Sequence, residues 1–295
     1  MGDVLAGNHA VWEFDSDSIL IRFARGMRTP RTPRLLHALG ARRIPFEALS
    51  GVTVSATGSG GKRDAVVLHA VPRPGADPLM EAAAGQLRAA WDPYRLVLAA
   101  DRSGQVAEFA GALRDRLGPE AAEPAGRFLV RVPEPPLQLK AYDARLAFDG
   151  SAVTFHWSRT GATSTKWKAG DQRYALSALT GVEWRSPEGP GGHLRLLPRD
   201  ATGDPRPDHD LAAAVFGVGY GAVHESLPFA AAVLAALRGR TPVASVPAPA
   251  SAGGHSRAHA DERLHHLNEL HGAGLLTDAE YAALRDRFAA DTAQA

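Results

Sequence analysis

Residues 12–23, with the sequence WEFDSDSILIRF, decide the fold because a diverged copy, LAFDGSAVTFHW, returns at residues 146–157. The two stretches align without a gap, at a constant offset of 134 residues. The segments ALSGV at 48–52 and ALTGV at 178–182 follow at an offset of 130, and Phe109 matches Phe229 at 120. Offsets that fall steadily while the order is kept are typical of a duplication with shortened loops. The sequence therefore predicts one fold used twice.

Apolar residues in the first part of each copy alternate with polar ones. Ile19, Ile21 and Phe23 have the period of two that places side chains on one face of a strand, and Tyr94, Leu96 and Leu98 show the same period. Turn-forming residues separate these runs at 15–17, 58–61 and 72–75. The pattern predicts antiparallel strands joined in hairpins.

Helical spacing replaces the alternation at the end of each copy. Ser226 is expected to cap the second helix, with Pro228 in its first turn, where a missing N–H costs little. Strands followed by one closing helix predict a mainly β fold with closing helices (α+β), similar to a pleckstrin-homology-like, partly open barrel. The apolar helix positions are Val106, Phe109, Ala110, Leu113 and Leu117 in the first copy and Phe229, Val233 and Leu237 in the second.

Four segments are predicted along the chain. Residues 1–136 and 137–240 are the two repeats, 241–260 form a linker rich in Pro, Ala, Ser and Gly, and 261–295 form a helical hairpin. The linker has almost no large apolar residue, so burial cannot offset the entropy of ordering it.

The last segment carries helix signals of its own. Gly272 and Gly274 are expected to end a first helix, and residues 277–280 (TDAE) form a capping box that starts a second. Two short helices cannot form a stable core alone, so their apolar faces need a second copy of the hairpin, an outside partner or the body of the protein. The candidate partner-binding residues are Leu264, Leu267, Leu270, Tyr281, Leu284 and Phe288.

Two resemblances extend this interpretation. The pattern of Leu264, Leu267, Leu270, Gly274 and Thr277, continued by Glu280 and Tyr281, resembles the SHOCT module, a short C-terminal helical hairpin of bacterial proteins. Residues 1–240, with WEFD at 12–15, PFEALSGV at 45–52 and VPRPGADPL at 71–79, resemble an actinobacterial family of unknown function that occurs as a tandem pair before a SHOCT tail. The resemblances imply pleckstrin-homology-like repeats and a hairpin for oligomerisation or partner binding, and they bring no catalytic residues.

Composition excludes several classes of protein. There are 33 basic and 32 acidic side chains and no cysteine, which removes disulfide frameworks, thiolate metal sites and thiol nucleophiles. No signal peptide is visible at the start of the sequence. The longest uncharged apolar run, Leu211 to Val223, has 13 residues, too short for the roughly 20 of a membrane helix. A cytoplasmic protein is expected, with peripheral attachment to a membrane as the alternative.

An arginine-rich stretch is the candidate anion-binding site. No acidic residue lies between Asp17 and Glu47, and guanidinium groups pair phosphate bidentately, so the stretch could hold a lipid headgroup or nucleic acid. A solvated or internally paired loop is the alternative, because only four of the basic residues are lysine and the chain simply prefers arginine. The candidates are Arg22, Arg25, Arg28, Arg31, Arg34, Arg42 and Arg43; the second copy has Arg159, Lys166, Lys168 and Arg173 with Asp171.

No motif for catalysis, cofactor or metal binding is complete. Residues 57–62 are expected to form a hairpin turn, and the glycine-rich residues 217–222 a strand that another backbone approaches. His255 and His259 have ligand spacing but lack further ligands, and Asp204, Asp208 and Asp210 fit turns. No catalytic residue, cofactor or metal is therefore predicted. Core packing is the expected role of the tryptophans, Trp12, Trp91, Trp157, Trp167 and Trp184.

A non-enzymatic adaptor or scaffold is the function that the sequence favours. The tail would self-associate or dock a protein partner, and tethering would make weak contacts effective. The alternative is binding to anionic membrane lipid or nucleic acid through the arginine-rich stretch. Hydrolase activity is a third and weaker hypothesis, because no nucleophile, base and orienting group can be assigned.

Overall fold

The computed structural model describes residues 4–23, 33–57, 64–201 and 203–240. Contacts divide the chain into two compact units, Met1–Thr241 and Pro242–Ala295. Both repeats belong to the first unit. The expected linker and helical hairpin lie outside the described residues.

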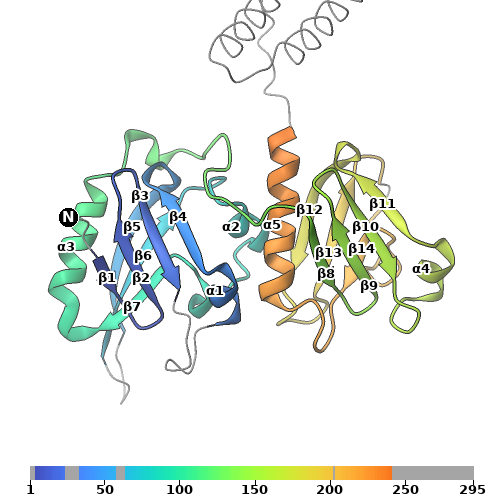
Figure 1. Ribbon diagram of the computed structural model, residues 1–295, viewed down its shortest axis with the longest axis horizontal. Helices are drawn as coiled ribbons and strands as arrows, with labels where there is room; N and C mark the ends of the chain where they lie inside the picture. The colour runs from blue at the N-terminus through green and yellow to red at the C-terminus, as the bar shows by residue number, and fades with distance from the viewer. Residues whose placement is uncertain (1–3, 24–32, 58–63, 202, 241–295) are drawn as a thin grey trace, which may run out of the picture. The chain divides into compact units, whose positions relative to one another are not determined.

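The first repeat consists of two antiparallel sheets and short helices (Figure 1). A four-stranded sheet has the order β1-β2-β3-β4, and a three-stranded sheet has the order β5-β6-β7. The strands are β1 (Val4–Ala6), β2 (Ala10–Phe14), β3 (Ser18–Phe23), β4 (Ala41–Pro45), β5 (Leu49–Thr57), β6 (Ala65–Pro72) and β7 (Arg95–Ala99). The helices are α1 (Arg34–Leu39), α2 (Pro78–Ala83) and α3 (Ser103–Arg114), with 3-10 turns η1 (Phe46–Ala48), η2 (Ala89–Trp91), η3 (Ala100–Arg102) and η4 (Pro119–Ala122).

The second repeat has the same strand order in a shorter form. Its sheets are β11-β10-β9-β8 and β12-β13-β14. The strands are β8 (Leu137–Lys140), β9 (Ala144–Phe148), β10 (Ala152–Trp157), β11 (Gln172–Ala175), β12 (Leu179–Arg185), β13 (His193–Pro198) and β14 (Ala213–Val215). The helices are α4 (Ser164–Ala169) and α5 (Val223–Arg240), with η5 at Leu176–Ala178.

The predicted duplication is visible in the strand register. Ile19 pairs with Phe14 in the first repeat, and Val153 pairs with Phe148 in the second. The alternating residues of β3 and β10 are buried as expected, which confirms the strand prediction for residues 12–23 and 146–157. The mainly β, α+β fold class is also confirmed.

Each repeat has a closing helix, but the two helices are buried differently. Helix α3 is amphipathic and buries Val106, Phe109, Ala110 and Leu113 on the first repeat's core, as predicted. Helix α5 is buried at every position from Leu227 to Val233. A helix that is apolar around its circumference requires packing on more than one side.

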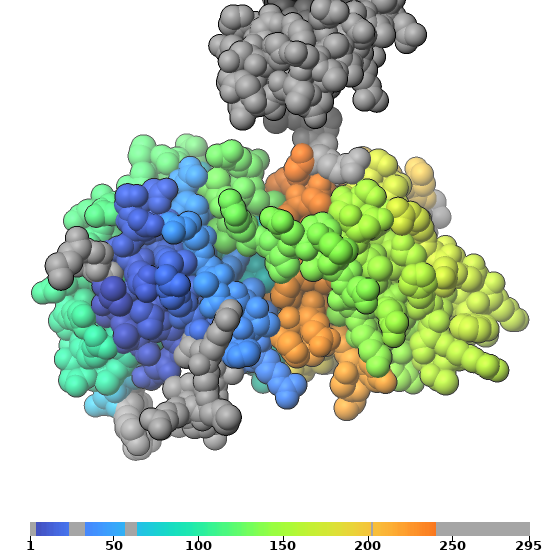
Figure 2. All heavy atoms as spheres, in the orientation of Figure 1, coloured from blue at the N-terminus to red at the C-terminus, as the bar shows by residue number. Residues whose placement is uncertain are grey.

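Helix α5 belongs to both repeats. It packs on β12 of its own repeat and on α1 and α2 of the first repeat. Leu35 of α1 and Leu79, Ala82 and Ala83 of α2 join the apolar cluster of the second repeat. In Figure 2 the orange surface of α5 is bordered by blue and green atoms of the first repeat and by yellow-green atoms of the second. We call this contact between α5 and helices α1 and α2 the seam.

Three local expectations were wrong. Ser226 does not cap α5, because the helix begins at Val223; its Oγ instead donates to the Ala222 carbonyl and accepts a bond from Trp184 Nε1. Residues 217–222 form a tight turn before α5 instead of a strand. Trp167 is 51% exposed on α4, whereas Trp12, Trp157 and Trp184 are buried as expected.

Candidate functional site

Polar contacts reinforce the apolar seam. The side-chain amide of Gln86 makes two hydrogen bonds to the backbone of the second repeat. Its Nε2 donates to the Trp184 carbonyl at 2.9 Å, and its Oε1 accepts from the Ser186 N–H at 3.0 Å. Arg88 pairs with Glu188 at 3.0 Å. At the other end of α5, Arg238 pairs with Glu81 at 3.2 Å and lies over the ring of Phe128 at 4.0 Å. Each of these contacts joins a specific residue of the first repeat to a specific residue of the second. Together they fix the position of the two repeats relative to each other.

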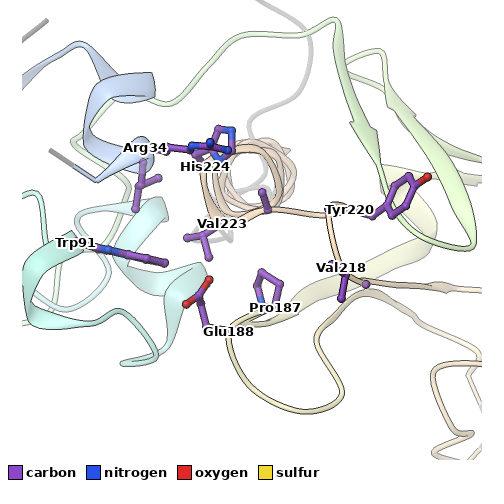
Figure 3. Close-up of a pocket in the computed structure, with 12 residues that line it drawn as sticks. Arg34, Trp91, Pro187, Glu188, Val218, Tyr220, Val223 and His224 are labelled. Atoms are coloured by element: carbon purple, nitrogen blue, oxygen red, sulfur yellow. The ribbon is translucent and has the colours of Figure 1, made fainter. Parts of the chain in front are cut away.

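A cavity of about 370 Å³ opens beside the seam (Figure 3). Helix α1, the start of α5 and the turn before it contribute to its walls. In Figure 3 Arg34 and His224 lie on one side of the space, and Glu188 lies on the opposite side. The residues that line it are Arg34, Leu35, Trp91, Pro187, Glu188, Gly217, Val218, Gly219, Tyr220, Ala222, Val223 and His224.

The turn before α5 depends on glycine. Gly219 has φ of 79° and Gly221 has φ of 70°, a backbone region that side chains disfavour. A Cβ at Gly221 would lie 2.1 Å from a carbon of the Phe216 ring, so the turn could not close with another residue there. The Gly221 N–H donates to the Lys140 carbonyl at 2.9 Å and ties the turn to β8. The glycine-rich residues 217–222 thus form a structural turn.

The charges around the cavity are unevenly paired. Glu188 is already neutralised by Arg88, and His224 lies 3.7 Å from Glu225. Arg34 is exposed, and its side chain has no hydrogen-bond or ion-pair partner within the described ranges. Among the described residues, the cavity therefore has an unpaired cation on one side and a paired carboxylate on the other, with Leu35, Trp91 and Val223 supplying apolar surface.

The structure disperses the predicted arginine site. Arg22 pairs with Glu13 at 3.2 Å, and Arg43 pairs with Asp15 at 2.5 Å, both at the surface. Arg34 lines the cavity beside the seam, whereas the paired Arg22 and Arg43 lie on the four-stranded sheet of the first repeat. Arg25, Arg28 and Arg31 lie outside the described residues.

Arg42 has a structural role in the core. Its guanidinium makes two hydrogen bonds of 2.9 Å to Asp77, and Tyr94 Oη donates to the same carboxylate at 2.7 Å. Burial raises the pKa of Tyr94 well above its ordinary value, and the negative charge of Asp77 acts in the same direction. The phenol therefore remains a donor, and Arg42 is not available to an outside anion.

The basic stretch of the second repeat is also partly internal. Lys166 is fully buried, and its Nζ donates to Asp143, to the Pro207 carbonyl and to the Ala213 carbonyl at 2.6, 2.7 and 2.8 Å. Arg173 pairs with Asp149 at 3.0 Å. Several residues that the sequence grouped by charge thus hold loops to strands.

The described residues contain no cluster of three or more His, Asp or Glu side chains placed to hold a metal ion. Asp204 and Asp210 both pair with Arg195, and Asp208 pairs with Arg206. None of the described helices is long and apolar enough to cross a membrane. His255, His259 and the six partner-binding candidates of the tail lie outside the described residues.

The family model for the domain of unknown function DUF4429 matches residues 12–114 and 146–234. The chain belongs to the DUF4429 family. The two matched segments coincide with the two repeats. No curated protein gives a significant match to the sequence.

The seam between the DUF4429 repeats was missed by sequence reasoning. Two of its polar residues, Gln86 and Arg88, lie in a loop with no motif. A signal for the apolar part did exist: α5 has no charged residue between Glu225 and Arg238, whereas α3 contains Glu108 and is exposed on one side. An uncharged helical stretch of this length indicates burial on several sides, but the elements that pack against it follow only from the tertiary structure.

Proposed function

We propose that the protein is a non-enzymatic adaptor or scaffold in which the two DUF4429 repeats form one binding body and the C-terminal tail mediates assembly. The observation that carries the proposal is the seam. Two repeats that share the apolar surface of α5 behave as a single platform, and the predicted linker to the tail begins at residue 241, directly after that helix. A rigid body with a tethered assembly segment is suited to holding partners at high effective concentration.

Each repeat is proposed to be a pleckstrin-homology-like, partly open barrel. The support is topological: a four-stranded antiparallel sheet, then a three-stranded one, then a closing helix, in that order twice. This architecture presents loops and sheet edges for binding and requires no catalytic centre.

The non-enzymatic assignment is supported by the use of the buried charges. Arg42 with Asp77 and Lys166 with Asp143 are enclosed pairs whose hydrogen bonds are directed at neighbouring protein groups. Within the described ranges, neither pair lines a cavity described above. A hydrolase would need a nucleophile and a base that converge on such a cavity.

The tail is proposed to be a SHOCT hairpin that self-associates or docks a protein partner through Leu264, Leu267, Leu270, Tyr281, Leu284 and Phe288. The test compares the molar mass of the full chain with that of a chain truncated after Ala250, by size-exclusion chromatography with light scattering. We expect a multimer that becomes a monomer on truncation, and the same loss when Leu267→Asp and Leu270→Asp are combined. A full chain and a truncated chain of the same subunit number would overturn self-association.

Binding of an anionic membrane lipid or nucleic acid through the arginine-rich stretch is the second candidate function. The observation that favours it is Arg34, which is exposed and unpaired within the described part of the chain and lies two positions after residues 24–32 with Arg25, Arg28 and Arg31. Binding should fall steeply as salt is raised. Replacement of Arg28, Arg31 and Arg34 by Ala should abolish binding to anionic vesicles or single-stranded DNA; unchanged binding would exclude this stretch.

A further inference from the structure

The outer face of the second repeat carries a hollow of about 740 Å³ that neither proposed function uses. It lies over β8, β9 and β10, and its residues include Lys140, Tyr142, Arg145, His156 and Tyr220. Among the described residues that line it there is no carboxylate. The hollow therefore has a positive potential that its own walls do not cancel.

Two cations stand directly opposite each other in this hollow. Lys140 of β8 pairs in register with Arg145 of β9, and both side chains are exposed. Like charges in opposite positions destabilise a sheet, so the arrangement opposes folding. In the part of the chain that the structure describes, the Arg145 guanidinium has no ion pair or hydrogen bond. An anionic ligand held between the two side chains would relieve this repulsion.

The third residue of this row across the strands, His156, already has a polar partner. His156 of β10 is opposite Arg145, and its Nδ1 lies 2.7 Å from Asp171. Lys140 and Arg145 are thus the cations of the row that remain available to a ligand.

Aromatic side chains form the wall beside the cations. Tyr142 is 49% exposed, and its ring meets that of Tyr220 edge to face at 6.1 Å. Lys140 Nζ lies 5.0 Å from the centre of the Tyr220 ring, which orients the ammonium group. A Cβ at Gly217 would lie only 3.1 Å from Tyr142, so this glycine makes room for the tyrosine. The exposed Tyr142 ring offers a surface on which a flat ring can stack.

The first repeat provides an internal comparison. The constant offset of 134 places Ala6 and Val11 where the second repeat has Lys140 and Arg145, and Asn8 where it has Tyr142. The register agrees, because Ala6 pairs with Val11 as Lys140 pairs with Arg145. Both cations and the tyrosine are therefore absent from the corresponding face of the first repeat and are not required by the fold.

We propose that this hollow binds a phosphate ester, with Lys140 and Arg145 on the phosphate and Tyr142 against the organic group. A dianionic phosphate balances both cations, whereas a carboxylate balances one, and the guanidinium fork matches two phosphate oxygens. The phosphate can belong to a soluble nucleotide-like molecule or to a phospholipid headgroup. The chemistry of recognition is the same in both cases.

The test uses the full chain at low salt with three probes. Calorimetry measures binding of adenosine monophosphate and of inorganic phosphate, and flotation measures binding to phosphatidate vesicles against phosphatidylcholine vesicles. We expect binding in at least one phosphate arm. Nucleotide binding identifies a soluble ligand, and selective binding to phosphatidate identifies a headgroup.

Variants then locate the site. Lys140→Ala and Arg145→Ala should each weaken binding about tenfold or more, as expected for the loss of one charge-assisted bond. Tyr142→Ala should weaken binding of adenosine monophosphate and leave that of inorganic phosphate unchanged. Arg173→Ala is the matched control, because Arg173 is an exposed cation of the same sheet that is already paired with Asp149. Replacement of Arg28, Arg31 and Arg34 is the second control and separates this site from the arginine-rich stretch.

Two results would overturn the proposal: no binding in any of the three phosphate arms, or equal weakening by Arg173→Ala and Arg145→Ala. The first would show that the hollow takes no phosphate ester, and the second would show diffuse attraction to the basic surface. Thermal unfolding at or above the wild-type temperature should verify that each variant is folded, because Lys140 and Arg145 are exposed and removing either one relieves their repulsion.

Discussion

Arg42 and Arg43 are neighbours on β4, and the alternation of a strand sends them to opposite environments. Arg42 is buried with Asp77 and Tyr94, and Arg43 is at the surface with Asp15. A buried charge that loses its partner costs far more free energy than an exposed one, because water cannot replace the partner. Two adjacent arginines of the same predicted cluster should therefore differ strongly in their effect on folding.

Arg42→Met should lower the free energy of unfolding by about 3–5 kcal/mol, because it leaves the Asp77 carboxylate buried without its cation. Arg43→Met is the matched control and should change the free energy little, since its pair with Asp15 is screened by solvent. Urea unfolding of the two variants measures both. Similar midpoints would show that Arg42 does not carry a buried charge pair.

His9 should make stability depend on pH. Burial lowers the pKa of His9 below its ordinary value, and its Nε2 lies 3.0 Å from the Arg95 carbonyl. Below a pH of about 6.5 the unfolded state therefore binds a proton that the folded state does not, so stability falls as the pH is lowered from 7 to 5.

His9→Asn should reduce the loss of unfolding free energy between pH 7 and pH 5, measured by urea titration. His37→Asn, at an exposed position of α1, is the control and should leave that loss unchanged. Carboxylates such as Asp149 do not contribute to the change between pH 7 and pH 5. The pKa of Asp149 is lowered mainly by hydrogen bonds from Ser151, so its contribution to the free energy of unfolding is lost only below about pH 4. Equal pH dependence in the wild-type chain and in His9→Asn would contradict the assignment.

Helices α3 and α5 close the two repeats in equivalent positions but have different neighbours. Helix α3 exposes Glu108 to solvent, whereas the corresponding surface of α5 is rich in alanine and buried. Small side chains allow α2 to approach α5 closely, and Leu79 of α2 is 1% exposed in the shared cluster. The difference converts a closing helix into the contact between two repeats.

Leu79→Ala should lower the free energy of unfolding by about 2–5 kcal/mol, the usual range for a buried leucine. Because Leu79 packs in the seam, hydrogen exchange should become faster in α5 of the other repeat. Leu113→Ala is the control: Leu113 is equally buried, but in the first repeat's own core, so its effect on exchange should remain in that repeat. Unchanged exchange in α5 of the Leu79→Ala chain would show that the seam does not couple the repeats.

At the scale of the whole molecule, the seam makes the two repeats interdependent. Separation would expose the apolar surfaces of Leu35 and Leu79 on one side and of α5 on the other. Large exposed apolar patches favour association, so each repeat alone should be a poor monomer.

A fragment of residues 137–240 should self-associate when expressed alone, and co-expression with residues 1–136 should restore a one-to-one complex. Light scattering of the purified fragments measures both outcomes. The chain of residues 1–240 serves as the control and should be monodisperse, because it retains the seam. A stable monomer of residues 137–240 would contradict the interdependence of the repeats.

The sequence by itself determined the duplication, the strands and the fold class. These features follow from local periodicity: the alternation in residues 12–23 and 146–157 has one physical solution, a strand with a buried face, and its repetition requires two copies. The closing helix α3 was also predictable, because its four buried residues have helical spacing. The pairing of the charged residues was not predictable, because the order of charges along the chain does not reveal which partner a side chain meets in space.

Only the tertiary structure decided how these elements meet. It placed Arg42 inside and Arg43 outside, gave α5 a second set of neighbours, and brought Tyr220 beside Lys140, 80 positions apart in the sequence. Each of these contacts joins residues that are distant along the chain, so their energies depend on the packed fold as a whole. Local spacing determines which face of an element is apolar, whereas the partner of that face is selected by the packing of all elements together.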